Sequence, residues 1–221
     1  MNSLRHGTRA LVALGGITLA LALSVPCDAM TFKVITLGGE PAIVGMGEIG
    51  NGDAERLKKV LVPSSRHSMG YFALVLSSPG GSVRAAFELS TLMDQHNINT
   101  YVPSGAVCAS SCAAIVFIAG REHVVVGDGI LAFHGCYDAK TRKIVDLCNE
   151  KIAEHAVEHG TSYGSIMAFI QSTPADQVVT FGAVDASCWG ISKYVISPTP
   201  LNYERCVVDA INEVVKGYKS K

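Results

Sequence analysis

Three polar side chains in this sequence are of the types that perform nucleophilic catalysis. Ser111 lies in the segment CASSCAA, His134 directly follows the apolar run ILAF, and Asp176 opens the segment DQVVT. Acyl transfer by serine needs a hydroxyl at a helix start, a base, an acid that orients the base, and backbone N–H donors for the oxyanion. The glycines of residues 77–83 (SSPGGSV) follow an apolar run, and glycine lets the backbone approach a substrate closely.

The elements that must position these residues alternate between strand and helix. Residues 72–76 (FALVL) form a continuous apolar run that ends in a glycine loop, which is typical of a buried parallel strand. Residues 82–95 place apolar side chains at helical spacing. Further strands are expected at 100–102, 124–126 and 130–133, and further helices at 53–61, 111–119, 150–159, 164–171 and 203–216. The alternation predicts a single α/β domain in this chain of 221 residues.

The composition is that of a globular protein. Hydrophobic residues make up 48% of the chain and charged residues 17%, which excludes a disordered chain. The 18 basic and 19 acidic side chains nearly balance, so the charge argues against nucleic acid or anionic lipid as a partner.

Residues 1–29 have the organisation of a secretory signal. Arg5 and Arg9 precede an uncharged run of about 16 residues, and small residues at 27 and 29 suit cleavage after Ala29. The run is shorter than the roughly 20 residues that span a bilayer, which disfavours an uncleaved anchor. We therefore expect a soluble mature domain of residues 30–221, exported to the bacterial periplasm.

Cysteine usage agrees with export. Six cysteines follow the predicted signal, and an even number in an exported chain predicts disulfides, although six cysteines allow fifteen pairings. Cys136 and Cys148 flank a polar, turn-like stretch and are the favoured pair. Cys108 and Cys112 have the spacing of half a zinc site, which is disfavoured because no second close Cys or His pair lies in their neighbourhood. The other candidates are Cys108, Cys112, Cys188 and Cys206.

In order and approximate spacing, these segments resemble the proteolytic subunit of Clp protease, in the ClpP/crotonase superfamily. They are most similar to exported bacterial ClpP-like predicted peptidases, which share the SPGGSV and CAS[AS]C elements. The resemblance runs from about residue 46 to residue 196 and implies stacked β-β-α units. It leaves a homo-oligomer open, but a compact insert replaces the region of the usual ring contacts, and no ATP-driven unfoldase is expected outside the cytoplasm.

The resemblance also implies roles for individual residues. Ser111 matches the nucleophile, His134 the general base and Asp176 the orienting acid, with Asp185 as the alternative acid. The backbone N–H groups of Gly81 and Cys112 match the oxyanion donors.

Two other motifs compete with this interpretation. Residues 45–50 (GMGEIG) match a dinucleotide fingerprint, but no acid lies between Glu55 and Glu88 to bind the ribose, so a strand-to-helix turn capped by Asp53 is favoured. Residues 155–159 (HAVEH) match the H-x-x-E-H pattern of zinc metallopeptidases. A zinc site also needs a third protein ligand, and no acid downstream lies in a recognisable zinc-ligand motif. We therefore favour the interpretation that these residues lie on a solvated helix face.

Together these features predict an exported, ATP-independent serine hydrolase that acts on peptides or proteins through an acyl-enzyme, with no metal or organic cofactor. The alternative from another class is a catalytically inactive binding scaffold on the same fold. A crotonase-type acyl-CoA enzyme suits neither the compartment nor a Ser/His/Asp set.

Overall fold

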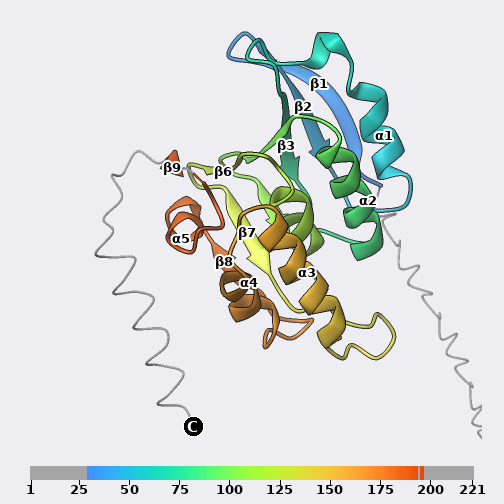
Figure 1. Ribbon diagram of the computed structural model, residues 1–221, viewed down its shortest axis with the longest axis vertical. Helices are drawn as coiled ribbons and strands as arrows, with labels where there is room; N and C mark the ends of the chain where they lie inside the picture. The colour runs from blue at the N-terminus through green and yellow to red at the C-terminus, as the bar shows by residue number, and fades with distance from the viewer. Residues whose placement is uncertain (1–28, 194, 197–221) are drawn as a thin grey trace, which may run out of the picture.

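The computed structural model describes residues 29–193, 195 and 196 (Figure 1). Within them the chain forms one domain with two mixed β-sheets and flanking helices, so the predicted α/β class is confirmed. Residues 1–28 of the predicted signal (1–29), the predicted helix 203–216 and Cys206 lie outside the described residues.

The larger sheet has six strands, and its centre is the apolar run predicted from the sequence. The strand order is β1-β2-β3-β4-β6-β9. β1 pairs antiparallel with β2, and every other neighbouring pair is parallel. The strands are β1 (Thr31–Leu37), β2 (Glu40–Met46), β3 (Phe72–Ser77), β4 (Ile98–Val102), β6 (His123–Val126) and β9 (Val195–Ile196).

The smaller sheet positions two of the three predicted catalytic residues. It consists of β5 (Val107–Ala109), β7 (Ile130–Phe133) and β8 (Val179–Phe181), in the order β5-β7-β8. β5 and β7 are parallel, so their carboxyl ends lie at the same edge of the sheet. Ser111 is the second residue after β5, and His134 follows β7 directly. This pairing brings together two segments that are far apart in the sequence.

The helices surround these sheets. α1 and α2 pack side by side next to the larger sheet, and α3 and α4 pack together beside the smaller one (Figure 1). The predicted helices among the described residues are all present, but α3 begins four residues earlier than expected. Their bounds are α1 (Asp53–Val60), α2 (Val83–Asp94), α3 (Asp146–Glu158), α4 (Tyr163–Ile170) and α5 (Ala183–Cys188), with the 3-10 turn η1 (Pro63–Ser65) and the π-helix η2 (Cys112–Phe117).

The core is built around η2, whose six residues are all buried. Ile115, Phe117 and Leu89 of α2 are fully buried in the same apolar cluster as β3 and β7. The small residues before Ile115 let this helix pack tightly. The core therefore fixes the helix that starts beside Ser111.

The glycines of residues 45–50 form a strand-to-helix turn, as favoured from the sequence, but the N-cap of α1 is Gly52 and Asp53 is the first residue of the helix. The N–H of Ile49 donates to the Gly80 carbonyl (2.7 Å), and the N–H of Gly50 donates to the Asp53 carboxylate (2.7 Å). Gly47 N–H likewise donates to the carbonyl of Ser77. These amides are used within the protein, so the turn does not offer the open backbone cradle that binds a dinucleotide phosphate.

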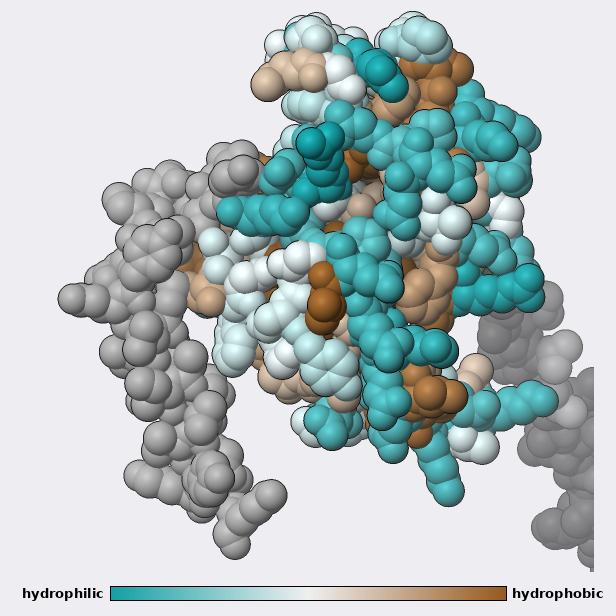
Figure 2. Space-filling view, in the orientation of Figure 1, coloured by the Kyte–Doolittle hydropathy of each residue, from teal (hydrophilic) through white to brown (hydrophobic). Residues whose placement is uncertain are grey.

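The face of the domain that carries α3 is largely hydrophilic (Figure 2). No helix among the described residues is long and apolar enough to cross a bilayer.

Candidate active site

Ser111 lies at the start of η2, after a strained turn. Ser110 has a φ of 56°, a left-handed conformation that is uncommon for a residue other than glycine. Gly80 packs directly against this turn: a Cβ on Gly80 would lie 2.5 Å from the Ala109 carbonyl oxygen and 2.7 Å from the Ser110 Cβ. The glycine loop after β3 and the turn before η2 therefore pack closely against each other, and a side chain at Gly80 would prevent this.

A disulfide closes the same turn. Cys108 and Cys112 are bonded, their Cα atoms are 5.3 Å apart, and both residues are fully buried. The bond joins the end of β5 to the start of η2 and encloses Ser110 and Ser111. Both cysteines were expected in disulfides, and the structure now assigns their pairing.

Gly81 contacts the Ser111 hydroxyl. Ser111 Oγ donates to the Gly81 carbonyl at 3.2 Å. Gly81 has a φ of 144°, and a Cβ there would lie 2.3 Å from the Ile49 carbonyl oxygen, so only glycine fits. Among the described residues the Gly81 N–H donates to no acceptor. Cys112 is the first residue of η2, where a backbone N–H has no acceptor within its own helix.

His134 is half-buried, and one of its ring nitrogens is bound. Nδ1 lies 2.8 Å from the carbonyl oxygen of Gly135. A carbonyl only accepts, so Nδ1 carries the hydrogen and Nε2 of the neutral ring keeps a lone pair. The Tyr137 ring lies beside the imidazole, with the ring centroids 5.4 Å apart.

Ser111, His134 and Gly81 line the same cavity, which has a volume of about 390 Å³. Its remaining walls are mostly apolar and come from three elements and one loop. They include Val83 of α2, Ala114 of η2, Ile152 of α3, and Tyr137 and Ala139 of the loop after His134. The arrangement suits a small apolar group held next to a hydroxyl and an imidazole.

The segment between His134 and α3 folds compactly over this cavity. Cys136 and Cys148 form a disulfide, which confirms the favoured pairing. Within the loop, Tyr137 pairs with Ile144 in an antiparallel bridge. Arg142 lies over the Tyr137 ring and donates to the carbonyl of Ala175 at 3.0 Å. The loop is thus tied to α3 on one side and to the segment preceding Asp176 on the other.

Asn149 supports the backbone beside His134, a role that was not predicted from the sequence. It is fully buried in α3; its Oδ1 accepts from the Cys136 N–H at 2.7 Å and its Nδ2 donates to the Ile170 carbonyl. The Gly135 N–H donates to Thr173. These bonds fix the backbone directly after His134. A polar residue on the buried face of a predicted helix could have indicated this role. Asn149 was missed because the helix was expected to start at residue 150.

Asp176 does not join this group. It is exposed in a turn before β8, it is not part of the cavity wall, and no hydrogen bond links it to His134 among the described residues. Asp185, the alternative acid, is exposed on α5. Nor does a hydrogen bond join Ser111 to His134 within the described residues. The structure therefore brings the hydroxyl and the imidazole to one cavity, and the acid stays a prediction.

Of the remaining disulfide candidates, Cys188 is also disulfide-bonded, whereas Cys206 lies outside the described residues.

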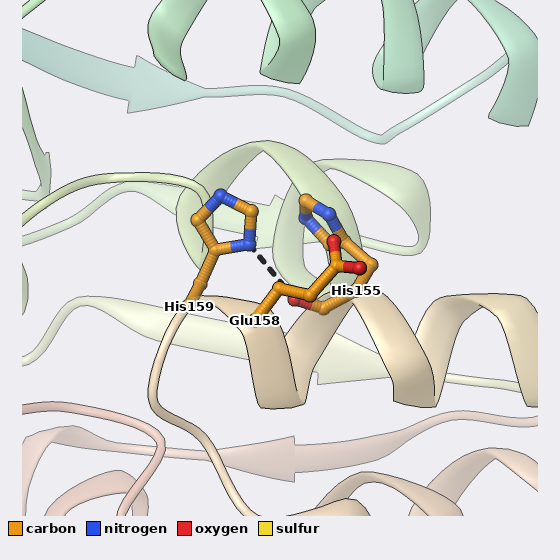
Figure 3. Close-up of side chains that lie close together, drawn as sticks. All are labelled: His155, Glu158 and His159. Atoms are coloured by element: carbon orange, nitrogen blue, oxygen red, sulfur yellow. Dashed lines mark hydrogen bonds between the residues drawn. The ribbon is translucent and has the colours of Figure 1, made fainter.

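The H-x-x-E-H residues lie on the last turn of α3 and directly beyond it (Figure 3). His155 is only 6% exposed, and its Nε2 donates to the Ile115 carbonyl at 3.1 Å. Burial lowers the pKa of His155 below its ordinary value, because a charged imidazolium is poorly solvated there. The solvated face that the sequence favoured is thus wrong for His155, which packs between α2 and η2.

No protein-family model matches the chain, and no curated protein is similar enough to count as a relative.

Proposed function

We propose that the protein is an exported, ATP-independent serine hydrolase, a peptidase, in which Ser111 is the nucleophile and His134 the general base. One observation carries the proposal: the two residues follow adjacent parallel strands and line one cavity with Gly81. Convergence of a hydroxyl, an imidazole and glycine amides on one hollow is what acyl transfer requires.

In the proposed reaction, Ser111 Oγ leaves the Gly81 carbonyl, gives its proton to His134 Nε2 and attacks the substrate carbonyl carbon. The N–H groups of Gly81 and Cys112 stabilise the oxyanion of the tetrahedral intermediate. His134 then donates the proton to the leaving amine as the scissile bond breaks, which leaves an acyl-enzyme. Water, deprotonated by the same imidazole, hydrolyses the ester.

We propose that the Asp176 carboxylate accepts the hydrogen bond from His134 Nδ1 when substrate is bound. In the present geometry the Gly135 carbonyl accepts that bond. Either acceptor holds the imidazole in the tautomer that leaves Nε2 free to act as the base.

The element order supports the stacked β-β-α units of the ClpP/crotonase superfamily. β4 lies in the larger sheet, β5 in the smaller one, and η2 follows; β6, β7 and α3 repeat this order. A preceding unit is formed by β3, the bridge from Ser78 to Cys108, and α2. The two later units thus contribute one strand to each sheet and then a helix, whereas the first contributes only an isolated bridge beside the smaller sheet.

Export to the bacterial periplasm belongs to the same proposal. The two disulfides paired within the described residues are consistent with an oxidising compartment. In this proposal, residues 1–29 act as the secretory signal that directs export.

A fluorophosphonate probe, which labels activated serines, tests the proposal. We expect covalent labelling of the oxidised wild-type protein at Ser111, and none in the Ser111→Ala or His134→Ala variant. Ser110→Gly is the matched control, since glycine tolerates the φ of 56° and only the neighbouring hydroxymethyl side chain is lost. Failure to label folded wild-type protein would favour the inactive binding scaffold.

A further inference from the structure

A second cluster of metal-type side chains lies where α3 ends against α2. His155, Glu158 and His159 each offer one ligand atom, and these atoms all lie within 4.8 Å of one another. Figure 3 shows the two imidazoles and the carboxylate extending to the same side of the helix end. Asp94, the last residue of α2, adds a second carboxylate: its Oδ1 lies 2.9 Å from His159 Nε2.

Both histidines have one ring nitrogen fixed by a backbone carbonyl. His155 Nε2 donates to Ile115 at 3.1 Å, and His159 Nδ1 donates to the carbonyl of His155 at 2.8 Å. A carbonyl only accepts, so these nitrogens carry hydrogens, which leaves His155 Nδ1 and His159 Nε2 as the nitrogens for a ligand. Histidines that bind metals are held in this way, by a second-sphere hydrogen bond from the other ring nitrogen.

The contact between His159 and Asp94 calls for a cation. Both the free ring nitrogen and the carboxylate oxygen are acceptors, and they approach to 2.9 Å. Such a contact is favourable only with a proton or a metal ion between or beside the two atoms. With both imidazoles neutral, as metal binding requires, the carboxylates of Asp94 and Glu158 leave two negative charges, which one divalent ion would neutralise.

The cluster is reachable and partly preorganised. A hollow of about 290 Å³ is lined by Asp94, His155 and Glu158. Lys151 and Glu154 also line it, and their opposite charges offset each other. The Phe87 ring packs edge-on against His155 with the centroids 5.4 Å apart, which holds the buried imidazole in place.

We propose that Asp94, His155, Glu158 and His159 bind one divalent transition-metal ion of the zinc class. Nitrogen and carboxylate ligands at about 2.0–2.2 Å from Zn²⁺ lie about 3.3 Å apart in a tetrahedron. The carboxylates of Asp94 and Glu158 are exposed, and binding requires them to rotate to that spacing. Four protein ligands leave no open coordination position, so the site is structural and joins the ends of α2 and α3. It is therefore not the water-activating centre of a metallopeptidase.

Zinc titration of the tag-free, chelator-treated protein tests this site. We expect isothermal titration calorimetry to show one Zn²⁺ per chain and the melting temperature to rise with bound zinc. The His159→Gln and Asp94→Asn variants should each lose about tenfold or more in zinc affinity. Glu154→Gln, on the same helix and in the same hollow, is the matched control and should bind like the wild type.

Circular dichroism of each variant verifies the fold, and His155→Gln is omitted because it would also break the buried bond to Ile115. The proposal would be overturned by an absence of binding heat in the wild type, or by unchanged affinity in both His159→Gln and Asp94→Asn. Serine labelling by the fluorophosphonate probe does not depend on this site, so the two proposals fail separately.

Discussion

At the scale of single residues, the site combines a strained serine turn with an imidazole whose tautomer is set by a main-chain carbonyl. Ser110 holds its left-handed φ because Gly80, the disulfide and the end of β5 surround it. Backbone strain of this kind costs about 1–3 kcal/mol and persists only where the surrounding structure imposes it. Here it directs the next residue, Ser111, into the cavity.

The contribution of Asp176 can be measured directly. We expect Asp176→Asn to lower kcat for a peptide or activated ester about tenfold or more, because a carboxylate stabilises the imidazolium better than a carbonyl does. The loss should be smaller than that of Ser111→Ala, since the Gly135 carbonyl still fixes the tautomer. Asp185→Asn is the control and should leave kcat unchanged.

An unaltered kcat in Asp176→Asn would show that the carbonyl alone orients His134.

At the scale of elements, two disulfides of different span hold the two sides of the cavity. Cys108–Cys112 closes the serine turn, and Cys136–Cys148 closes the loop that carries Tyr137. Loop-closure entropy assigns about 2 kcal/mol to the shorter cross-link and about 3 kcal/mol to the longer one. The longer bond should thus matter more for stability, and the shorter one for catalysis.

We therefore expect opposite rankings for the two double variants. Cys136→Ala/Cys148→Ala should lose more free energy of unfolding in urea, whereas Cys108→Ala/Cys112→Ala should label more slowly with the fluorophosphonate probe. The second effect follows because the Ser110 turn and the Cys112 N–H lose their cross-link. Equal labelling rates in the two variants would contradict the positioning role of the shorter bond.

Much of the element pattern could be predicted from the sequence, because local periodicity carries it. The apolar run of β3 and the helical spacing of α2 depend only on neighbouring residues, as does the polar turn between Cys136 and Cys148. The π form of η2 could not be predicted, since its backbone bonding is set by packing against the core. The burial of Asn149 and His155 likewise depends on elements distant in the sequence.

The same limit applies to the candidate site. The resemblance in motif order predicted that Ser111, His134 and Asp176 converge beside Gly81, and all but Asp176 line one cavity. The motifs could not predict that the Gly135 carbonyl accepts a hydrogen bond from His134 Nδ1, because that bond depends on one conformation of the loop.

At the scale of the whole molecule, one buried histidine should make stability depend on pH. His123 is fully buried at the start of β6, and burial lowers its pKa from 6.5 to about 4. The folded protein therefore keeps the ring neutral where the unfolded chain already protonates it. This contribution to stability is complete above about pH 6.5 and is lost as the pH falls through about 4.

The expected loss is about 3 kcal/mol, measured as the free energy of unfolding in urea between pH 7 and pH 4. His123→Phe is the matched variant: it keeps a ring against Phe117 and loses only the bond to the Gly120 carbonyl. Its stability should fall less steeply over this range than that of the wild type. Parallel pH profiles would assign the acid sensitivity to other groups.

The disulfide around the serine turn has a consequence for the cell that makes this protein. Ribosomes deliver the chain into a reducing cytosol, where thiols stay unpaired and the Ser110–Ser111 turn would lack its cross-link. Under the proposed function, full hydrolytic power would then arise only after secretion. Newly made molecules would therefore react more slowly with the proteins around them than the oxidised enzyme does.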